Sequence, residues 1–439
     1  MQPPNPHAIL HELENPAAYA AELDVLACRH GSGQRRVWQQ EGLELSELSP
    51  SSRRQLAKAL ARSVPRGEYR LGPSNARSAF LGGKARTLYR ASITDTAVVA
   101  VLAKLLRRVV DPLLSERVYS YRPGRSSLEA VRDFADFLRD HRQAIADPRA
   151  RGLFVLRRDV ARYGESIPVD PESPLWSMLD KVFAHWGIGA QEPIAALTRA
   201  AVRPSIASEA GAYQLERGVP TGSAIQPVIC NLYLSQLDAA LGGVRGSFYA
   251  RFGDDIVFAH ADADVAKRAR DTADDVVGTL KLAFKAEKSR DFFFNAAGRH
   301  SAGLPGAAQL EYLGLRLHFS GAVGLTSAKA RRLLREVTRR LDNDLRLTRA
   351  LSREEALESM CHTASESLDP RRPLAQVMVP LVNHAVDDRG QLRQLDYLVA
   401  LRIAERDSGQ RGVRAFRHVS YQSLRAAGLR SLLVARNRR

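Results

Sequence analysis

The strongest constraint on the fold is a pair of adjacent carboxylates between two short apolar runs. Residues 249–258 have the sequence Tyr-Ala-Arg-Phe-Gly-Asp-Asp-Ile-Val-Phe. Alternating apolar residues favour extended chain and Gly253 favours a tight turn, so the segment predicts a β-hairpin with Asp254 and Asp255 at its tip. Two carboxylates this close repel each other unless a cation binds between them, and Mg²⁺ suits an all-oxygen site. Asp-Asp is also ordinary turn chemistry, so the hairpin alone leaves both interpretations open.

The composition indicates a folded protein that binds a polyanion. The 439 residues are 45% hydrophobic, enough to bury a sizeable core. The 65 Lys and Arg residues against 48 Asp and Glu give a formal net charge of +17, mostly through arginine, which suits bidentate phosphate contacts. No apolar run of about 20 residues and no basic amphipathic helix occurs, so nucleic acid is the expected partner and membrane association is not expected.

Cysteine usage and the amino-terminal sequence predict a cytoplasmic location. Cys28, Cys230 and Cys361 are isolated and odd in number, so they form neither a disulfide framework nor a zinc site. The chain begins Met-Gln-Pro-Pro-Asn-Pro, without a basic segment followed by an apolar one, so no secretory signal is expected. Both features fit a reducing cytosol.

Periodicity predicts alternating helical and extended segments. Ser49 and Pro50 before an apolar-periodic run predict a helix start, with Ser49 as the N-cap. Helical spacing is expected at 16–64, 95–114, 126–141, 173–206, 224–241, 262–284 and from 327 onward. Extended chain is expected at 66–93, as a basic ribbon turning at Gly82-Gly83, and at 153–160, 212–217 and 310–325, with a loop at 285–309.

A third carboxylate, Asp159, ends the apolar strand Leu-Phe-Val-Leu-Arg-Arg-Asp. A strand and a neighbouring hairpin in one sheet can bring Asp159 beside Asp254 and Asp255, where three carboxylates would hold two Mg²⁺ ions. By itself, Asp159 would be interpreted as a helix cap or a surface residue. The three acidic residues together favour the metal site.

The segment from Gly218 to Pro227 precedes a predicted helix. Two glycines and a proline before a helix N-terminus expose backbone N–H groups next to the positive end of the helix dipole, which can support a phosphate group. The alternative is a plain loop that leads into the helix.

Three segments, in this order and spacing, resemble motifs A, B and C of reverse transcriptases. They are Asp159-Val-x-x-Tyr-x-x-Ser-Ile, Gly218-x-Pro-x-Gly-Ser-x-x-x-Pro and Phe252-Gly-Asp-Asp. Such enzymes have the polymerase fold that is compared to a right hand. The resemblance therefore implies an α+β protein with fingers, a palm of antiparallel sheet packed on helices, and a helical thumb. The implied domains are a helical extension at 1–65, fingers at 66–150, a palm at 151–325 with fingers helices inserted at about 173–217, and a helical thumb and extension at 326–439.

Further segments extend the resemblance over about residues 80–340. Tyr121-Arg-Pro-Gly-Arg-Ser is similar to the fingers signature of group II intron and retron-type enzymes, and Gly83-Lys-Ala-Arg-Thr-Leu to the basic fingers strand. Lys288 matches the motif D lysine, and Glu311-Tyr-Leu-Gly matches the primer-grip motif E.

The resemblance implies a role for each matching residue. Asp159, Asp254 and Asp255 would be catalytic and would hold two Mg²⁺ ions, or Mn²⁺, with the backbone carbonyl of Val160. Lys288 would protonate the leaving pyrophosphate. The implied nucleotide-binding residues are Lys84, Arg86, Tyr163, Gly164, Pro220, Thr221 and Gly222. Arg122 and Arg125 would contact the template backbone or brace the fingers, and Tyr312 and Gly314 would help to hold the primer end.

A basic stripe supplies two more candidate nucleic-acid contacts, Arg335 and Arg339. Arg331, Arg332, Arg335, Arg339 and Arg340 recur at spacings of three to four, which places them on one helix face that could follow a duplex backbone. The alternative is a generic solvated face.

Three positions depart from the common pattern of these enzymes. Gly164 occupies the place of an aromatic residue that packs under the sugar and excludes a 2′-hydroxyl, so either Tyr163 takes that role or discrimination against ribonucleotides is weak. Thr221 replaces the usual motif B glutamine, and Gly253 replaces an alanine. The acidic residues are intact.

The segment Tyr163-Gly-Glu-Ser-Ile-Pro-Val is similar to abortive-infection and other defence-associated bacterial reverse transcriptases. This similarity implies an RNA-directed DNA polymerase that uses dNTPs in antiphage defence, either copying a non-coding RNA or working without a template. Implied partners are the RNA template, the DNA product and a companion defence protein or a second copy of the chain.

Two other functions remain open from the sequence. An RNA-dependent RNA polymerase shares the palm and often has Gly-Asp-Asp, but it usually has a second motif A aspartate where this chain has Tyr163 and Gly164. A non-catalytic RNA-binding scaffold could retain the palm for structure, but the joint presence of Asp159, Asp254, Asp255 and Lys288 argues against it.

Overall fold

A computed structural model describes residues 11–29, 49–81, 84–144, 152–367 and 386–433, which divide into two compact units. Unit 1 comprises Met1–Ser126 and Leu156–Arg290, and unit 2 comprises Ser127–Val155 and Asp291–Arg439. The boundaries of these two units differ from those of the four domains predicted from the sequence. The four-domain division stays a prediction.

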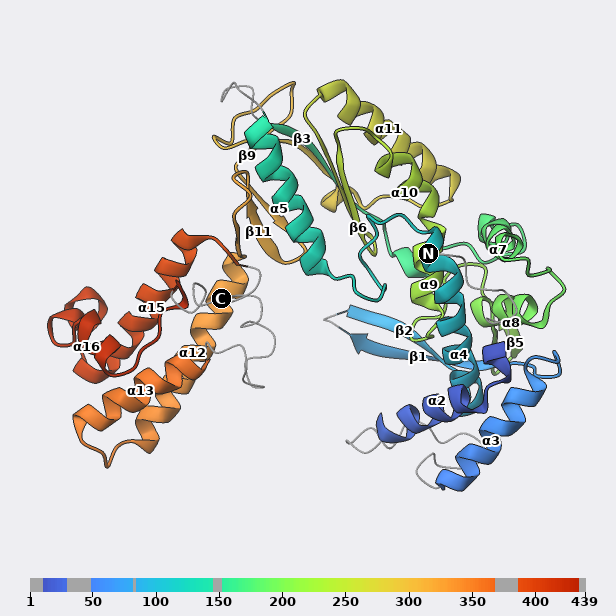
Figure 1. The fold of residues 1–439 in the computed structure, drawn as a ribbon, viewed down its shortest axis with the longest axis horizontal. Coiled ribbons are helices and arrows are strands. Elements are labelled where there is room, and N and C mark those ends of the chain that lie inside the picture. Colours follow the sequence, from blue (N-terminus) through green and yellow to red (C-terminus); the bar gives the residue numbers. More distant parts are fainter. Residues whose placement is uncertain (1–10, 30–48, 82–83, 145–151, 368–385, 434–439) are drawn as a thin grey trace. The chain divides into compact units, whose positions relative to one another are not determined.

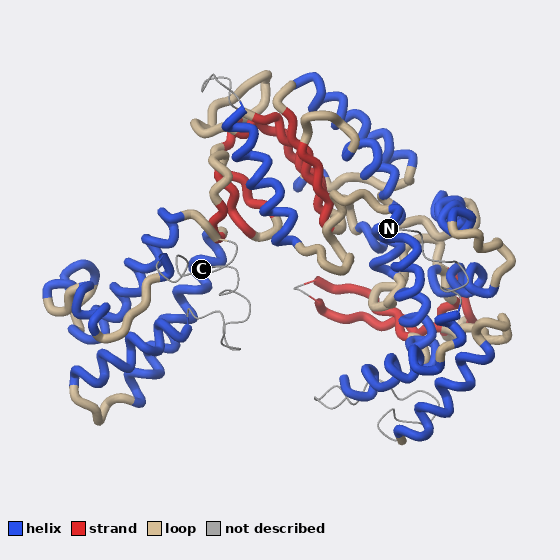
Figure 2. Tube along the Cα trace, viewed as in Figure 1, coloured by secondary structure: helices blue, strands red, loops and turns tan. Residues whose placement is uncertain are grey.

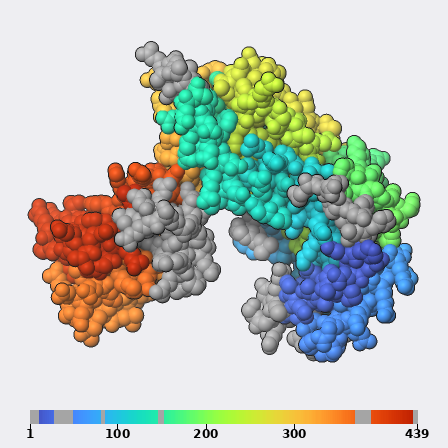
Figure 3. Space-filling model, in the orientation of Figure 1, coloured from blue at the N-terminus to red at the C-terminus, as the bar shows by residue number. Residues whose placement is uncertain are grey.

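Helices form the amino-terminal part of unit 1. Helix α3 begins after Ser49, whose hydroxyl accepts a hydrogen bond from Ser52 N–H at 3.1 Å, with Pro50 in the first position. The predicted N-cap is therefore confirmed. Helices α2 and α3 pack side by side, and α2 also packs on α4 (Figures 1 and 3). The elements here are η1 His11–Glu14, α2 Pro16–Arg29, α3 Pro50–Ser63, α4 Ile93–Val110 and η3 Asp111–Leu113.

The basic segment forms an antiparallel ribbon, as its sequence predicts. Strand β1 (Ser74–Leu81) pairs with β2 (Lys84–Arg90), and the expected turn at Gly82-Gly83 lies outside the described residues. Strand β1 also pairs in parallel with β4 (Ser205–Ser208), which pairs with β5 (Gly211–Gln214). The ribbon is thus part of a four-stranded sheet in the order β2-β1-β4-β5.

The sheet that carries the carboxylates has β7 between β6 and β3. Strand β3 (Leu153–Asp159) is buried along its length except at Arg157, as expected of a strand covered on both faces. Helices α10 and α11 pack on β6 and β7. The remaining elements of this part are α6 Tyr163–Ser166, α7 Pro174–His185, α8 Pro193–Val202, α9 Gln226–Tyr233, α10 Ser235–Gly242, β6 Phe248–Phe252, β7 Asp255–His260, α11 Ala263–Thr279 and η4 Ala286–Lys288.

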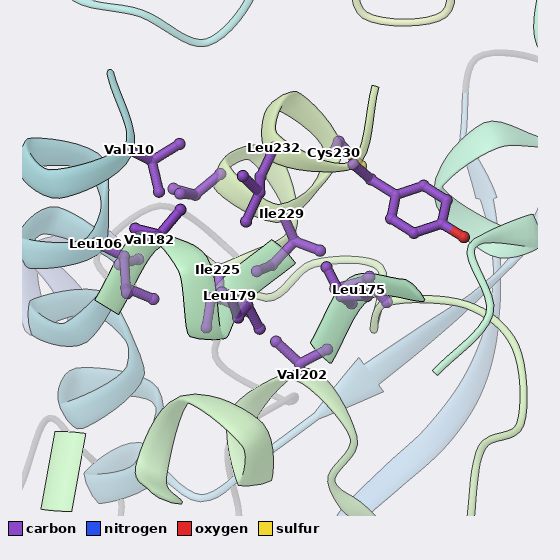
Figure 4. Packing of buried hydrophobic residues seen from close by; sticks show 14 of the residues in the cluster. Leu106, Val110, Leu175, Leu179, Val182, Val202, Ile225, Ile229, Cys230 and Leu232 are labelled. Carbon is purple, nitrogen blue, oxygen red and sulfur yellow. The ribbon is translucent and has the colours of Figure 1, made fainter. Parts of the chain in front are cut away.

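One hydrophobic core holds the helices of unit 1 together (Figure 4). Buried side chains from α4, α7, α8 and α9 interdigitate there, and their polar neighbours are hydrogen-bonded. The Trp186 indole N–H donates to the Val109 carbonyl at 2.8 Å, and the Tyr233 hydroxyl donates to the Leu280 carbonyl at 2.7 Å. The labelled members in Figure 4 are Leu106, Val110, Leu175, Leu179, Val182, Val202, Ile225, Ile229, Cys230 and Leu232.

Burial makes two thiols unreactive in the folded protein. It raises the pKa of Cys230 to about 12 and that of Cys361 to about 12, so almost no thiolate forms near pH 8. We expect a Cys28→Ser variant to resist a thiol-reactive dye in buffer and to react at both remaining cysteines in urea. Rapid labelling of Cys230 in buffer would contradict the packing in Figure 4.

Unit 2 combines small sheets with a helical carboxy-terminal part. Helix α5 (Ser127–Ala144) packs on the three-stranded sheet β10-β11-β12, and β8 pairs in parallel with β9. Between Ser327 and residue 433 the described residues form helices and loops only (Figure 2). The elements are β8 Arg290–Phe294, β9 Gly306–Ala307, β10 Gln309–Tyr312, β11 Leu315–His318, β12 Val323–Leu325, α12 Ser327–Leu347, α13 Arg353–Ser367, α15 Arg389–Ser408, η6 Gly412–Arg417 and α16 Tyr421–Ala426. No helix among the described residues is both long and apolar enough to cross a membrane.

Several segment predictions were wrong in detail. The expected helix 173–206 ends earlier and gives way to β4, because this four-residue strand forms only by pairing with β1 and β5. The expected loop 285–309 contains η4, β8 and β9, the expected helix 224–241 is broken at Leu234, and 310–325 forms three strands. Such short segments span too few residues to show a periodic pattern.

Candidate active site

The predicted hairpin is confirmed, and its turn is two residues long. Phe252 pairs with Asp255, which leaves Gly253 and Asp254 as the connection between β6 and β7. Gly253 has φ +67°, the left-handed region that a glycine adopts without strain. A glycine at the first of two turn residues matches the tight twist of a hairpin. The structure thus places Asp254 in the turn, as predicted, whereas Asp255, also predicted at the tip, is the first residue of β7 because it pairs with Phe252.

The structure brings Asp159 beside this turn. The Val160 N–H donates to the Asp254 carbonyl at 3.1 Å, so the end of β3 is hydrogen-bonded directly to the hairpin tip. The Asp159 side chain is only 6% exposed. Burial, and then the charge of Asp159, raise the pKa of Asp254. The two carboxylates therefore repel each other in a site with little water.

Asp255 points to a different partner. Its Oδ2 atom lies 3.1 Å from Nη2 of Arg157, which shares a face of β3 with Asp159. Burial raises the pKa of Asp255, and the charge of Arg157 opposes this shift. The Oδ1 atom of Asp255 is buried and has no hydrogen-bond partner among the described residues.

Lys288 completes the charged cluster, as predicted. Its ammonium forms an ion pair with Asp159 Oδ2, and this hydrogen bond raises the pKa of Lys288. The Lys285 N–H donates to the Asp159 carbonyl at 2.8 Å, which fixes the start of η4 beside the end of β3. Because the Lys288 side chain is 50% exposed, it can leave Asp159 without disturbing the core.

The three carboxylates do not converge as predicted. Among the described residues, no group of three His, Cys, Asp or Glu side chains is arranged to hold a metal ion. The physical reason is that Arg157 attracts Asp255 while Lys288 occupies Asp159. The predicted third ligand, Asp255, is thus paired with a cation of the protein itself.

The residues present nevertheless fit a divalent cation. The Lys288 ammonium already pairs with Asp159, so a positive charge is accommodated there. The pKa of Asp254 is raised, which a bound cation would reverse, and Oδ1 of Asp255 has no hydrogen-bond partner within the described part of the chain. The Val160 N–H donates to the Asp254 carbonyl, so the predicted backbone ligand lies next to the hairpin turn, and its role as a ligand stays a prediction. An all-oxygen set of this kind suits Mg²⁺.

Two distant segments frame the carboxylates. The Tyr89 N–H of β2 donates to the Thr221 carbonyl at 3.2 Å, and the Val219 N–H donates to the Gly164 carbonyl at 2.9 Å. The loop with Pro220, Thr221 and Gly222 therefore lies between the ribbon and the segment after β3. Arg86 is exposed on β2, and its contact with a phosphate stays a prediction. The side chain of Lys84, predicted for the same role, lies outside the described residues.

Tyr163 has a packing role, which differs from the predicted nucleotide contact. Its side chain is 6% exposed and its hydroxyl donates to the Cys230 carbonyl, because the short helix α6 turns the ring towards α9 and the core. At Gly164, a Cβ atom would lie 2.6 Å from Nε2 of Gln226, whose amide donates to the Val219 carbonyl at 3.2 Å. Gln226 thus covers the position where the common pattern has an aromatic residue.

The two fingers arginines brace their own loop. The Arg122 guanidinium donates to the carbonyls of Ser115 at 2.7 Å and Asp111 at 3.0 Å. The Arg125 guanidinium lies over the buried ring of Tyr119, 5.6 Å from its centroid. Of the two predicted roles for Arg122, template contact and bracing, this geometry favours bracing.

Four predicted primer and template residues belong to unit 2. Tyr312 is fully buried and meets Phe134 edge to face, so it packs in the core of that unit. Gly314, with φ +75°, lies in the tight turn between β10 and β11. On α12, Arg335 is exposed, whereas Arg339 forms an ion pair with Glu336 at 2.8 Å.

A buried ion pair supports the hairpin, and the sequence analysis missed it. Arg251 has an exposure of 0% and donates to both oxygens of Asp238 at 2.7 Å. Its Nη1 atom also lies 3.3 Å from the Gly253 carbonyl, so the guanidinium reaches the turn that carries Asp254. The Tyr249 hydroxyl donates to Asp238 at 2.7 Å. An arginine inside the apolar alternation of β6 was the available sequence signal.

The central part of the chain matches a known protein family. Residues 81–317 match the model of the family described as "Reverse transcriptase (RNA-dependent DNA polymerase)". None of the curated proteins matches the chain. Similar solved structures include an apo telomerase from Candida tropicalis, truncated from its C-terminal domain, and a telomerase from Candida albicans in complex with a fragment of telomeric RNA.

Both telomerase structures are distant relatives in sequence. Each is 12% identical to this chain, with TM-scores of 0.45 and 0.47. The matches cover 58% and 82% of this chain but 56% and 64% of the telomerase chains, so this chain spans less than two thirds of either. The predicted α+β class, with sheets packed on helices and a helical carboxy-terminal part, is confirmed by the fold. Since the family match covers more than half of its residues, the chain belongs to the reverse transcriptase (RNA-dependent DNA polymerase) family.

Proposed function

We propose that this protein is an RNA-directed DNA polymerase that adds dNTPs to a 3′-hydroxyl by a two-metal mechanism. The observation that carries the proposal is the hydrogen bond from Val160 to Asp254, which joins two acidic segments of a reverse transcriptase domain beside Lys288. Two repelling carboxylates, with Asp159 buried and Asp254 partly buried, are costly for a fold and are expected where a cation is bound.

In this proposal Asp159 and Asp254 would hold the two Mg²⁺ ions, with the Val160 carbonyl as a further ligand. When bound, the metal supplies the positive charge that lowers the pKa of a primer hydroxyl and neutralises the leaving pyrophosphate. Arg86 binds the triphosphate, and Lys288 leaves Asp159 and donates a proton to pyrophosphate. Arg157 keeps Asp255 charged and oriented next to the site.

The proposal extends to a role in bacterial antiphage defence. The defence role is supported by the similarity of residues 163–169 to defence-associated enzymes. The net charge of +17 supports an RNA template and a DNA product as binding partners. The template is a non-coding RNA, or synthesis needs no template. We also propose a cytoplasmic location, a companion protein or a second copy of the chain as a partner, and the four-domain division given above.

An incorporation assay tests the proposed activity. The protein is purified with the nucleic acid it carries and mixed with Mg²⁺ and labelled dNTPs or rNTPs, and the product is sequenced. We expect dNTP incorporation that stops when EDTA removes the metal. Product made only from rNTPs would favour the RNA polymerase alternative, and no incorporation of either class would favour the scaffold.

The basic stripe on α12 gives a test of nucleic-acid binding. Glu336 accepts hydrogen bonds from Arg339 and Arg340, which lower its pKa to about 2, so near pH 7 its negative charge offsets theirs. Arg335 is exposed on the same helix. We expect Arg335→Gln to lower the slope of log K against log salt by about 1, as for one lost phosphate contact, and Arg339→Gln to lower it less. Equal slopes for the two variants and the wild type would contradict phosphate binding by this helix face.

A further inference from the structure

The helices at the carboxy-terminal end of unit 2 form an open hollow. It has a volume of about 500 Å³, and its lining includes Arg393, Asp396, Tyr397, Phe416 and Tyr421. These residues come from α15, from η6 and from the first turn of α16; both α-helices are labelled in Figure 1. No residue of the proposed active site or of the stripe on α12 lines this surface, which we call the C-terminal hollow.

Two tyrosines of the C-terminal hollow are exposed. Tyr397 is 44% exposed and Tyr421 is 41% exposed. The ring of Phe416, which is partly buried, lies against Tyr397, with 5.7 Å between the ring centroids and 41° between the ring planes. Phe416 therefore supports Tyr397 from within the fold, and the exposed part of the tyrosine ring remains available to stack on another flat aromatic group.

The chain around the hollow is basic. Residues 389–433 include nine arginines and no lysine, against three acidic residues. Asp396 accepts hydrogen bonds from a hydroxyl at 2.5 Å and from a backbone N–H at 2.8 Å, both in the segment after α16. Glu405 and Asp407 form ion pairs with arginines outside the hollow, at 2.8 and 2.6 Å. The acidic side chains thus have other partners than the arginines that line or flank the hollow.

Three exposed arginines flank the two tyrosines. Arg393 lines the hollow and lies one helical turn before Tyr397 on α15. Arg425 lies one turn after Tyr421 on α16, and Arg417 lies on η6. Within the described part of the chain, none of these three arginines forms an ion pair with a carboxylate. Their guanidinium groups are therefore available for phosphate oxygens.

Exposed rings next to unpaired guanidinium groups suit a single-stranded nucleic acid. Every base has an aromatic face that can stack on a tyrosine, and the phosphates between the bases can pair with arginine. A duplex keeps its base faces stacked inside, so only an unpaired strand offers them. A second copy of this chain would bring the same net charge of +17 to a basic surface, and like charges oppose such a contact.

We propose that the C-terminal hollow binds single-stranded nucleic acid, with bases stacked on Tyr397 and Tyr421 and phosphates paired with Arg393, Arg417 and Arg425. The site goes beyond the proposed polymerase function, and binding there does not require polymerisation. RNA and DNA offer the same stacking faces and phosphates, so the experiment compares both.

Photocrosslinking locates the bound strand. The full-length protein is mixed with oligouridine or oligodeoxyuridine that carries 5-iodouracil, irradiated and digested, and the crosslinked peptides are identified by mass spectrometry. We expect crosslinks at Tyr397, Tyr421 or both, because iodouracil couples to an aromatic side chain that stacks on it. The strand with the higher yield identifies RNA or DNA as the preferred ligand. Absence of crosslinks at both tyrosines with both strands would overturn the assignment.

Substitutions measure the contribution of each ring. We expect Tyr397→Ala and Tyr421→Ala each to weaken binding of the single strand about tenfold, as for one lost stack, and to leave the affinity for a blunt hairpin duplex unchanged. Tyr397→Phe keeps the ring and should bind like the wild type. Val413→Ala is the matched control, because Val413 is 67% exposed on η6 and does not line the hollow. Thermal melting checks that each variant is folded.

Three outcomes of the binding experiment would contradict the proposal. Unchanged single-strand affinity in both Ala variants would show that the rings do not contact the strand. Equal losses for the strand and the duplex would show that the hollow does not select unpaired bases. A change of oligomeric state in light scattering, with unchanged strand binding, would assign the hollow to a contact between copies of the chain.

The crosslink also separates this site from the proposed function. It is measured on the wild type, so it decides the question even if a variant does not fold. A protein that forms the crosslink at Tyr397 or Tyr421 but extends no primer would support the C-terminal hollow, while the polymerase proposal would fail.

Discussion

Replacing Asp254 with Asn lowers the rate of dNTP incorporation by about 10³-fold or more, equivalent to roughly 4 kcal/mol of activation free energy. Asn retains the shape of the side chain but not the charge that binds a divalent cation. Because burial and Asp159 raise the pKa of Asp254, the charged form is less favourable in the folded chain than in the unfolded chain. Near pH 7 the neutral Asn should therefore leave the melting temperature unchanged or raise it. Steady-state kinetics measures the loss of rate, and thermal melting measures the stability.

The control for this prediction is another aspartate of unit 1. Asp271 is exposed on α11 and contacts its neighbour Arg270, so Asp271→Asn should change neither rate nor melting temperature. Asp255→Asn should lower the rate less than Asp254→Asn, because Asp255 is turned to Arg157. An Asp254→Asn enzyme that retains a tenth of the wild-type rate would exclude Asp254 as a metal ligand.

Replacing Arg251 with Met destabilises the protein by about 3–5 kcal/mol, because Asp238 is left as a buried charge without its partner. The guanidinium also gives up its contact with the Gly253 carbonyl, so the hairpin tip loses a support. Urea unfolding followed by tryptophan fluorescence measures the change, since Trp176 and Trp186 lie in unit 1. Arg270 on α11, whose side chain is 36% exposed, is the matched control, and Arg270→Met should change stability by less than about 0.5 kcal/mol.

A second substitution tests the cause of this loss. Asp238→Leu in the Arg251→Met background removes the unpaired charge and should recover most of the lost stability. The double variant should still incorporate nucleotide more slowly than the wild type, because the contact to Gly253 is not restored. If the double variant were as unstable as Arg251→Met alone, the loss would come from packing around Arg251 and not from the charge of Asp238.

Features set by adjacent residues could be predicted from the sequence. Gly253 and the Asp-Asp pair between alternating apolar residues define a hairpin, and the Ser49 cap depends on neighbours three residues away. The placement of Asp159 beside Asp254 was predicted from a strand and a neighbouring hairpin in one sheet, and the Val160 hydrogen bond supports it. These predictions needed no knowledge of side-chain direction.

Contacts between distant segments could not be predicted in the same way. Gln226 covers Gly164 only because the loop after Gly218 is hydrogen-bonded along the segment after β3. Tyr163 turns inward because its hydroxyl reaches the Cys230 carbonyl on α9. Arg251 finds Asp238 across a helix and a strand, and β4 forms because β1 is beside it. In each case the deciding partner is remote in sequence.

The sequence by itself determined which chemical groups this protein carries for binding metal ions and phosphates. Carboxylates at the ends of apolar strands and an excess of arginine predict metal and phosphate binding from local charge and strand alternation alone. Only the tertiary structure decided how those charges are shared, with Asp254 facing Asp159 while Arg157 takes Asp255 and Lys288 takes Asp159. It also showed that Arg251, buried in β6, pairs with Asp238 and reaches the Gly253 carbonyl in the turn. The physical reason is that electrostatic and packing energies depend on distances in space, which the order of residues along a chain does not specify.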